Sequence, residues 1–303
     1  MIADHESQSA LADVLGVVRD AHFHKGTLCP RCSCARTQRW GGFAGRQRYR
    51  CLGCRRTFSD LTGTPAAYIK KLDRWTAFVE CLGDSLSVRR CAALVGINTT
   101  TAFRWRHRLL RPLEIKHETA TGWIEMDQIR LPYSEKGRHA KGFGRASPRT
   151  LHRNVDSTDS PPITVFLIPD RTGHLVPAIG SARPNTAELE QILRGRVTSG
   201  VVVCARQGRL GPIARFARRI GGRFHDVRFG HRFRPGSRNR LVHVRRARRA
   251  LAAFLDWMRR FHGVATKYLL NYLNWFVLLD RCFRQGFREE MLRWPMAIGN
   301  SQS

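Results

Sequence analysis

Residues 29–54 read CPRCSCARTQRWGGFAGRQRYRCLGC, with the two pairs Cys29/Cys32 and Cys51/Cys54 separated by 18 residues. Two CxxC knuckles at this spacing place four thiolates at the corners of a tetrahedron, which is the geometry of a structural zinc site. Metal binding then supplies folding free energy that so short a segment cannot obtain from its own core. The sequence therefore predicts a zinc ribbon over residues 27–62, with Cys29, Cys32, Cys51 and Cys54 as the ligands.

The residues around the cysteines fit this prediction. Tyr49 and Phe58 flank the second knuckle, and we expect them to form a small aromatic core beside the metal. A redox CxxC motif needs one pair at a helix N-terminus, whereas both pairs here lie in turn-like sequence. Seven arginines surround the knuckles: Arg36, Arg39, Arg46, Arg48, Arg50, Arg55 and Arg56. They make the ribbon a candidate phosphate-binding surface, although zinc ribbons also act as docking sites for other proteins.

Helical periodicity appears on both sides of the ribbon. Residues 1–26 are expected to form a short N-terminal helix, and residues 72–112 a compact all-helical module. Within this module the sequence predicts a short helix over residues 88–94 and a tight turn at Gly96. Asn98 or Thr99 is expected to cap a second helix that ends at Leu110.

This is the helix-turn-helix pattern of DNA-binding domains. Residues expected on the exposed face of the second helix, within reach of bases and phosphates, are Thr99, Thr100, Thr101, Arg104 and Arg108. Phe103 and Trp105 are expected to pack inside the module. The alternative is an ordinary helical hairpin with a basic, solvated face.

The pattern changes at residue 122 to an α/β domain that we expect to end at 283, followed by a tail over 284–303. Strands are expected at 124–131, 163–168, 174–179, 201–204 and 223–229, and helices at 186–193, 211–220 and 241–283. Three strands followed by alternating helices and strands predict a mixed sheet flanked by helices. The fold class expected for the whole chain is thus mixed: a zinc ribbon, a small all-α helix-turn-helix and an α/β core.

Charge indicates the partner. The chain of 303 residues contains 53 Lys and Arg against 23 Asp and Glu, a net charge of +30, with a pI near 11.4. Such a surplus favours a polyanionic partner, and we expect double-stranded DNA. Residues 201–250 contain 15 arginines and one acid. Arg245, Arg246 and Arg249 are expected to point away from the sheet and to be available to DNA.

Three motifs together resemble the transposases of the insertion-sequence 1595 family: RYRCLGCRRTFSDLTGTP, the helix-turn-helix with TAFRWRHR, and DWMRRFHGVATKYLLNYLNWF. The resemblance covers roughly residues 27–281. It implies an RNase H-like core in which two Asp and an Asn or Glu hold Mg²⁺ or Mn²⁺ for DNA strand cleavage and joining. It also implies recognition of the terminal inverted repeats of the element by a homo-oligomer.

The residues at the positions of the family's metal ligands do not fit that chemistry. Asp127 stands where the first acid is expected, but Arg206 and Arg248 stand at the second and third positions. A guanidinium opposes cation binding, so we expect a degraded strand-transfer site in which Arg replaces the metal. Acids considered as replacements are Glu125, which shares a strand face with Asp127, and Asp170, Asp226 and Asp256.

The function expected from the sequence is therefore DNA binding in transposition, with enzymatic activity left open. The alternatives are an active transposase that uses substitute acids, and a domesticated zinc-ribbon and helix-turn-helix regulator or inhibitor without catalysis. No run of about 18 apolar residues and no secretion signal occur, so we expect no membrane association and a cytoplasmic, nucleoid-associated protein.

Overall fold

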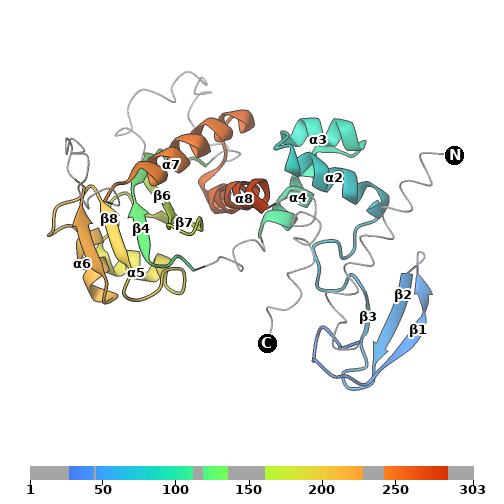
Figure 1. The fold of residues 1–303 in the computed structure, drawn as a ribbon. Helices are drawn as coiled ribbons and strands as arrows, with labels where there is room; N and C mark the ends of the chain where they lie inside the picture. The colour runs from blue at the N-terminus through green and yellow to red at the C-terminus, as the bar shows by residue number, and fades with distance from the viewer. Residues whose placement is uncertain (1–26, 44–45, 112–118, 136–160, 228–241, 286–303) are drawn as a thin grey trace. The chain divides into compact units, whose positions relative to one another are not determined.

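A computed structural model describes residues 27–43, 46–111, 119–135, 161–227 and 242–285. In these ranges the chain is a mixed α/β protein with three three-stranded sheets and seven α-helices. It divides into two compact units, residues 1–115 with 279–303, and residues 116–278 (Figure 1). The helix expected at 1–26 lies outside the described residues, as does the expected tail apart from 284–285, which continue the last helix.

The first sheet contains the cysteine segment. Strands β1 (Thr37–Phe43), β2 (Arg46–Cys51) and β3 (Thr57–Ser59) form an antiparallel meander. Tyr49 and Phe58 face each other across β2 and β3 with ring centroids 5.4 Å apart. They pack with Cys29 and Cys51 in a small core, as the sequence predicted. This core is too small to hold the segment together without a further cross-link.

The all-helical module consists of a short 3-10 turn (Leu72–Arg74) followed by α2 (Trp75–Gly83), α3 (Val88–Val95) and α4 (Thr99–Leu110). Its core is aromatic, because the ring of Trp105 lies edge-on to Trp75 and Phe78 with centroids 5.3 and 5.4 Å away. The packing of Trp105 predicted from the sequence is confirmed. Arg106 is buried beside these rings and donates hydrogen bonds to the carbonyl oxygen of Leu86 and to Cys91 Sγ. It thereby fixes the connection between α2 and α3.

The second unit has a sheet built from six strand segments. They are β4 (Trp123–Met126), β5 (Gln128–Leu131), β6 (Ile163–Pro169), β7 (Leu175–Gly180), β8 (Val202–Ala205) and β9 (Arg223–Asp226). Strands β5, β6 and β7 pair antiparallel, and β4, β8 and β9 pair parallel. The strands predicted at 163–168 and 174–179 are confirmed as β6 and β7, which pair as a hairpin.

Strands β4 and β5 are two halves of one strand. Gln128 pairs with Phe166, and an isolated bridge pairs Ile124 with Asp170 in the same antiparallel register. The two sheets therefore join into one, with the order β7, β6, β5/β4, β8, β9. The sequence predicted an unbroken strand over 124–131, whereas the structure interrupts it at Asp127.

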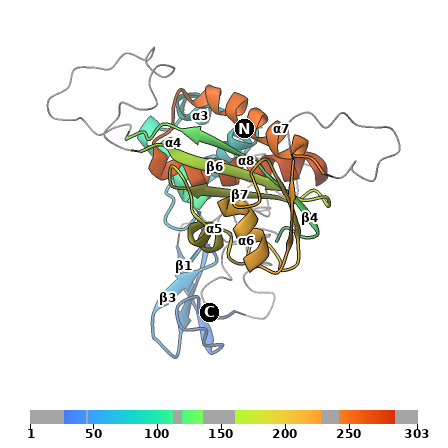
Figure 2. The same ribbon diagram turned by 90° about the vertical axis from the view of Figure 1, so that its left-hand side faces the viewer.

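Helices cover both faces of this sheet (Figures 1 and 2). Helices α5 (Thr186–Leu193) and α6 (Pro212–Arg219) lie on one face and enclose the main apolar core. Helix α7 (Arg245–Met258) lies across β4, β5 and β6 on the other face.

The helical stretch predicted at 241–283 is not continuous. A 3-10 turn (Arg259–Phe261) and His262, with a left-handed φ of 51°, separate α7 from α8 (Thr266–Gln285). The break lets Trp257 of α7 pack against Trp275 and Phe276, whose ring centroids lie 5.0 and 5.6 Å away. None of the described helices is long and apolar enough to span a membrane.

Candidate functional site

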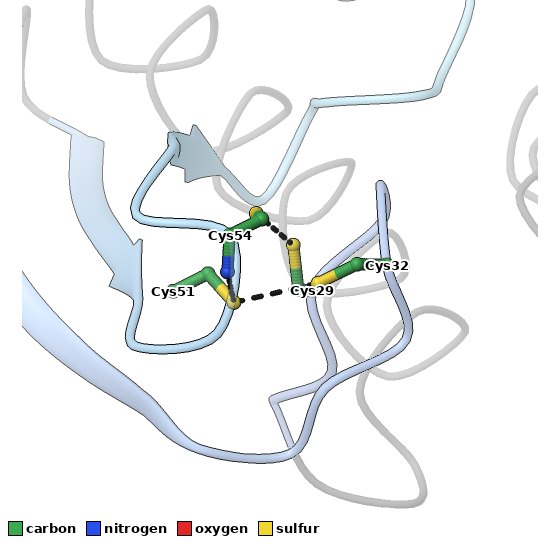
Figure 3. Close-up of side chains that lie close together, drawn as sticks. All are labelled: Cys29, Cys32, Cys51 and Cys54. Atoms are coloured by element: carbon green, nitrogen blue, oxygen red, sulfur yellow. Dashed lines mark hydrogen bonds between the residues drawn. The ribbon is translucent and has the colours of Figure 1, made fainter.

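The four cysteines of the two knuckles converge. All four Sγ atoms lie within 4.8 Å of one another, with Cys29 Sγ 3.7 Å from Cys54 Sγ and Cys32 Sγ 3.5 Å from Cys51 Sγ (Figure 3). A tetrahedron with Zn–S bonds of about 2.3 Å has edges of about 3.8 Å. The donor set and its size are therefore consistent with a structural zinc ion. Among the described residues, this is the only group of three or more His, Cys, Asp or Glu side chains that could hold a metal.

Backbone hydrogen bonds prepare two of these thiols to ionise. The amide of Cys54 donates to Cys51 Sγ at 3.4 Å, and this bond lowers the pKa of Cys51. A backbone hydrogen bond from Arg56 lowers the pKa of Cys54 to about 7. Thiolates are the form that binds zinc, so the second knuckle favours the ligating state before metal arrives.

Helices α3 and α4 and the turn between them have the local geometry expected from the sequence. Ser87 caps α3, and Asn98 caps α4 by accepting a hydrogen bond from the amide of Thr100 at 2.8 Å. Gly96 joins the helices with φ 65° and ψ 41°. A Cβ atom there would lie 2.2 Å from Nη1 of Arg74, which donates to the carbonyl oxygens of Val95 and Gly96. The left-handed conformation favours glycine at this turn, whereas the Arg74 side chain has a flexible end that can move away from a Cβ atom.

Most of the predicted DNA-contacting residues of α4 are accessible. Thr99, Thr100 and Arg104 are exposed, and Thr101 is half-buried. Arg108 is half-buried rather than exposed, and it donates to the carbonyl oxygen of Ala67 at 2.6 Å, so its contact with DNA stays a prediction. Phe103 was expected to pack inside, but it is 37% exposed and stacks edge-on with His107 at 4.4 Å.

In the second unit, Asp127 lies at the break between β4 and β5, directly below α7. Its Oδ2 atom lies 2.9 Å from Nε of Arg248, and its Oδ1 atom accepts a hydrogen bond from the amide of Gln128 at 3.0 Å. Arg206 follows Ala205 of β8, which pairs in parallel with Met126, the residue before Asp127. The three positions named from the sequence therefore lie at one end of two adjacent strands and the helix above them.

Glu125, the acid two residues earlier, is 1% exposed and fully engaged. Its Oε2 atom accepts hydrogen bonds from the amides of Arg246 and Ala247 at 2.8 and 3.3 Å, at the first turn of α7. Its Oε1 atom lies 3.1 Å from Arg171 Nη1 and 3.0 Å from His243 Nδ1. A carboxylate at a helix N-terminus offsets the positive end of the helix dipole, so Glu125 anchors α7 to the sheet.

His243 completes this buried network. Burial lowers its pKa, the charges of Arg171, Arg245 and Arg246 lower it further, and only Glu125 opposes them. The neutral ring fits the contacts, since Nε2 lies 3.2 Å from Arg171 Nη1, which can donate to it, and Nδ1 lies 3.0 Å from Glu125 Oε1. Sequence reasoning missed His243 and Arg171, because no local pattern links them to Glu125 across the chain.

The other acids considered as replacements lie elsewhere. Asp170 is buried in the β6–β7 turn; burial alone would raise its pKa, but hydrogen bonds from Thr172 and three backbone amides lower it. Asp226 pairs with Ala205, which places it on the α5 and α6 face, opposite to Asp127. Asp256 is exposed on α7 and lies 3.4 Å from Arg259. None of the three joins Asp127.

The arginines predicted on the outer side of α7 are exposed, namely Arg245, Arg246 and Arg249. Arg246 is also a structural residue, since its Nη1 atom donates to the carbonyl oxygens of Asp170 and Arg171 at 3.2 and 3.4 Å. The apolar positions Ala247, Leu251 and Phe254 face the sheet, as the helical spacing predicted.

Comparison with known proteins gives one informative relative. The chain is 30% identical over 178 residues to an uncharacterized protein in transposable element ISH50 of Halobacterium salinarum. The alignment spans 57% of this chain and 59% of the relative, so the chain covers about three fifths of that protein's length. No family model matches the sequence. The similarity relates the chain to a protein encoded by an insertion element.

Proposed function

We propose that this protein binds the terminal inverted repeats of an insertion element as part of DNA transposition. The observation that supports this most directly is the arrangement of α4, which presents Thr99, Thr100 and Arg104 at an accessible helix N-terminus behind a glycine turn. In helix-turn-helix domains this part of the second helix contacts base edges. The net charge of +30 and the relation to an insertion-element protein support the same function.

We also propose that residues 122–283 form an RNase H-like core whose strand-transfer site no longer holds metal. Three antiparallel strands followed by two parallel strands connected through helices fit such a core. At the matching site Arg248 pairs with Asp127, Arg206 lies at the neighbouring strand end, and Glu125 is occupied by α7. If a site of this kind bound Mg²⁺ or Mn²⁺, the ion would activate the attacking hydroxyl and stabilise the leaving oxygen. One carboxylate beside two guanidiniums is a poor donor set for such an ion.

A regulator or inhibitor of transposition without catalysis is the second candidate, and the Asp127–Arg248 ion pair favours it. Such a protein would occupy the element ends and compete with an active enzyme. An active transposase with substitute acids is the least supported alternative, because Asp170, Asp226 and Asp256 do not join Asp127.

Footprinting of the purified protein on the ends of its own element, with flanking genomic DNA as the control, tests the proposal. Protection confined to the terminal repeats is the expected result. Equal protection of all sequences would argue against end recognition. Co-expression with an active transposase of the same element then separates the candidates, because an inhibitor lowers the transposition frequency.

A further inference from the structure

The β1–β2 ribbon has one face that its own module leaves uncovered. The side chain of Trp40 is 44% exposed and that of Phe43 is 69% exposed. Large aromatic side chains normally bury most of their surface, because leaving it in water is unfavourable. Two exposed aromatic side chains on one short hairpin indicate a binding surface for a partner molecule.

A β-bulge places these two aromatic residues on the same face. Arg39 pairs with Tyr49 and Gly42 pairs with Gln47, so β1 contains one residue more than β2 between these pairs. Side chains alternate along a strand, and an extra residue reverses the alternation beyond it. Without the bulge, Trp40 and Phe43 would lie on opposite faces of the ribbon, three residues apart.

The shared face also carries guanidiniums. Arg50 pairs with Gln38 of β1 and with Thr57 of β3. Gln38 lies two residues before Trp40 and shares its face, so Arg50 lies on that face too. The Arg50 guanidinium lies 4.5 Å from the centroid of the Trp40 ring. Arg48 lies on the same face and donates to Thr57 Oγ1 at 3.0 Å. Tyr49 points the other way, into the core beside the zinc ligands. One face thus supports the metal site and the other combines aromatic rings with guanidiniums.

The charge of the module identifies the kind of partner. Residues 27–62 contain eight arginines and one acidic residue, Asp60, which is buried. An apolar protein surface would not complement this charge, whereas nucleic acid offers phosphates for the guanidiniums and flat bases for the rings. In a regular duplex the base faces are covered by their neighbours, so aromatic rings can stack only on bases that are unpaired or unstacked.

We propose that the Trp40/Phe43 face of the ribbon stacks against unpaired bases of DNA, with Arg48 and Arg50 bound to the adjoining phosphates. This inference rests on the proposed DNA-binding function and adds a preference for locally opened DNA. The Arg50 guanidinium covers one side of the indole, so a base takes the other side.

The test compares two labelled DNAs, a short blunt duplex and the same duplex with an unpaired bulge, by fluorescence anisotropy at fixed salt. In the Trp40→Ala/Phe43→Ala variant we expect affinity for the bulged duplex to fall about tenfold or more, because each stacked base contributes about 1–3 kcal/mol. Affinity for the blunt duplex should be unchanged. Trp40→Tyr should keep most of the preference, since tyrosine also stacks. Leu52→Ala, at an exposed apolar residue of the same module, is the matched control. Its affinities for both DNAs should equal those of the wild type.

Zinc content equal to that of the wild type shows that the variant ribbon is folded. A second readout uses 2-aminopurine in the bulge, whose fluorescence should fall when wild-type protein stacks on it and not with the double variant. Equal losses on both DNAs, or no loss on either, would overturn the inference while leaving the proposed DNA-binding function standing. A change only in self-association would also overturn it, in favour of a protein-docking surface. Failure of the wild type to bind either DNA would refute the proposed function itself.

Discussion

Arg248 Nε lies 2.9 Å from Asp127 Oδ2, at the break between β4 and β5. The two residues are 121 positions apart in sequence, and they meet because α7 crosses the sheet above this strand. The resemblance to insertion-sequence transposases implied a metal-ligand position for each of them, and the ion pair expected in place of a metal is present. The side chain of Asp127 is 22% exposed and that of Arg248 is 47% exposed, so a bound DNA phosphate could compete for the guanidinium.

This ion pair predicts that the protein binds DNA without cutting or joining it in Mg²⁺ or Mn²⁺. The double variant Arg206→Asp/Arg248→Asn removes two cations and restores an acid next to Asp127. It should bind Mn²⁺ detectably by calorimetry, whereas the wild type should not, because divalent ions require several oxygen donors. Metal-dependent cleavage of supercoiled DNA by the wild type, lost in Asp127→Ala, would contradict this prediction.

The cysteine cluster predicts one zinc ion per chain. Elemental analysis of protein purified without added metal should give a molar ratio near one. Cys29→Ser and Cys51→Ser should each remove most of it. Cys34→Ser is the matched control, since Cys34 packs beside the cluster but is not among the four converging sulfurs. Zinc that persisted after both ligand substitutions would rule out this site.

The arginine surplus predicts steep salt dependence of DNA affinity. Each phosphate neutralised contributes about −0.9 to the slope of log affinity against log salt, so about six contacts give a slope near −5. Titrations over a range of salt concentrations measure it. A slope shallower than about −3 would indicate that few of these arginines contact DNA.

Arg104 of α4 is predicted to read a base. Arg104→Ala should weaken binding to the preferred sequence by about 1–3 kcal/mol and have less effect on random DNA. Arg89→Ala, an exposed arginine on α3, is the control and should lower both affinities alike. An equal loss on both DNAs in Arg104→Ala would identify it as a phosphate contact instead.

The buried network predicts that Glu125 stabilises the core and that the core weakens in acid. Glu125→Ala should lower the free energy of unfolding by about 3–5 kcal/mol, because it leaves the largely buried Arg171 guanidinium and the first amides of α7 without their partner. Asp127→Ala, on the same strand, should cost at most about 1 kcal/mol, as its pair is partly exposed. Thermal or urea unfolding measures both.

The pH dependence follows from His243, whose pKa is lowered from its ordinary value of 6.5 in the folded protein. The unfolded chain therefore binds this proton at a higher pH than the folded one. The contribution of His243 is complete above pH 6.5 and declines as the pH falls below it towards the folded value. His243→Gln should flatten this part of the stability curve, and an unchanged curve would show that His243 is not its source.

The sequence by itself determined the features that depend on local spacing. The two CxxC pairs define a four-sulfur cluster because each knuckle is a short turn. Gly96 and Asn98 define the end of α3 and the start of α4, because a turn and a helix cap need only neighbouring residues. The β6–β7 hairpin was likewise determined by its local sequence. These elements are stabilised by contacts within a few residues, so the sequence pattern predicts them directly.

Only the tertiary structure decided which side chains serve the core and which remain accessible. Arg108 donates to the carbonyl oxygen of Ala67, Glu125 accepts from the first amides of α7, and Phe103 lies at the surface. The periodicity of their helix or strand was also compatible with DNA contact, metal binding and core packing, respectively. The common face of Trp40 and Phe43 depends on a bulge that is defined by pairing with β2. For Arg108 and Glu125 the deciding partner lies far along the chain, which hides the contact from any local pattern. The bulge in turn depends on pairing with β2, which the sequence pattern of β1 alone does not contain.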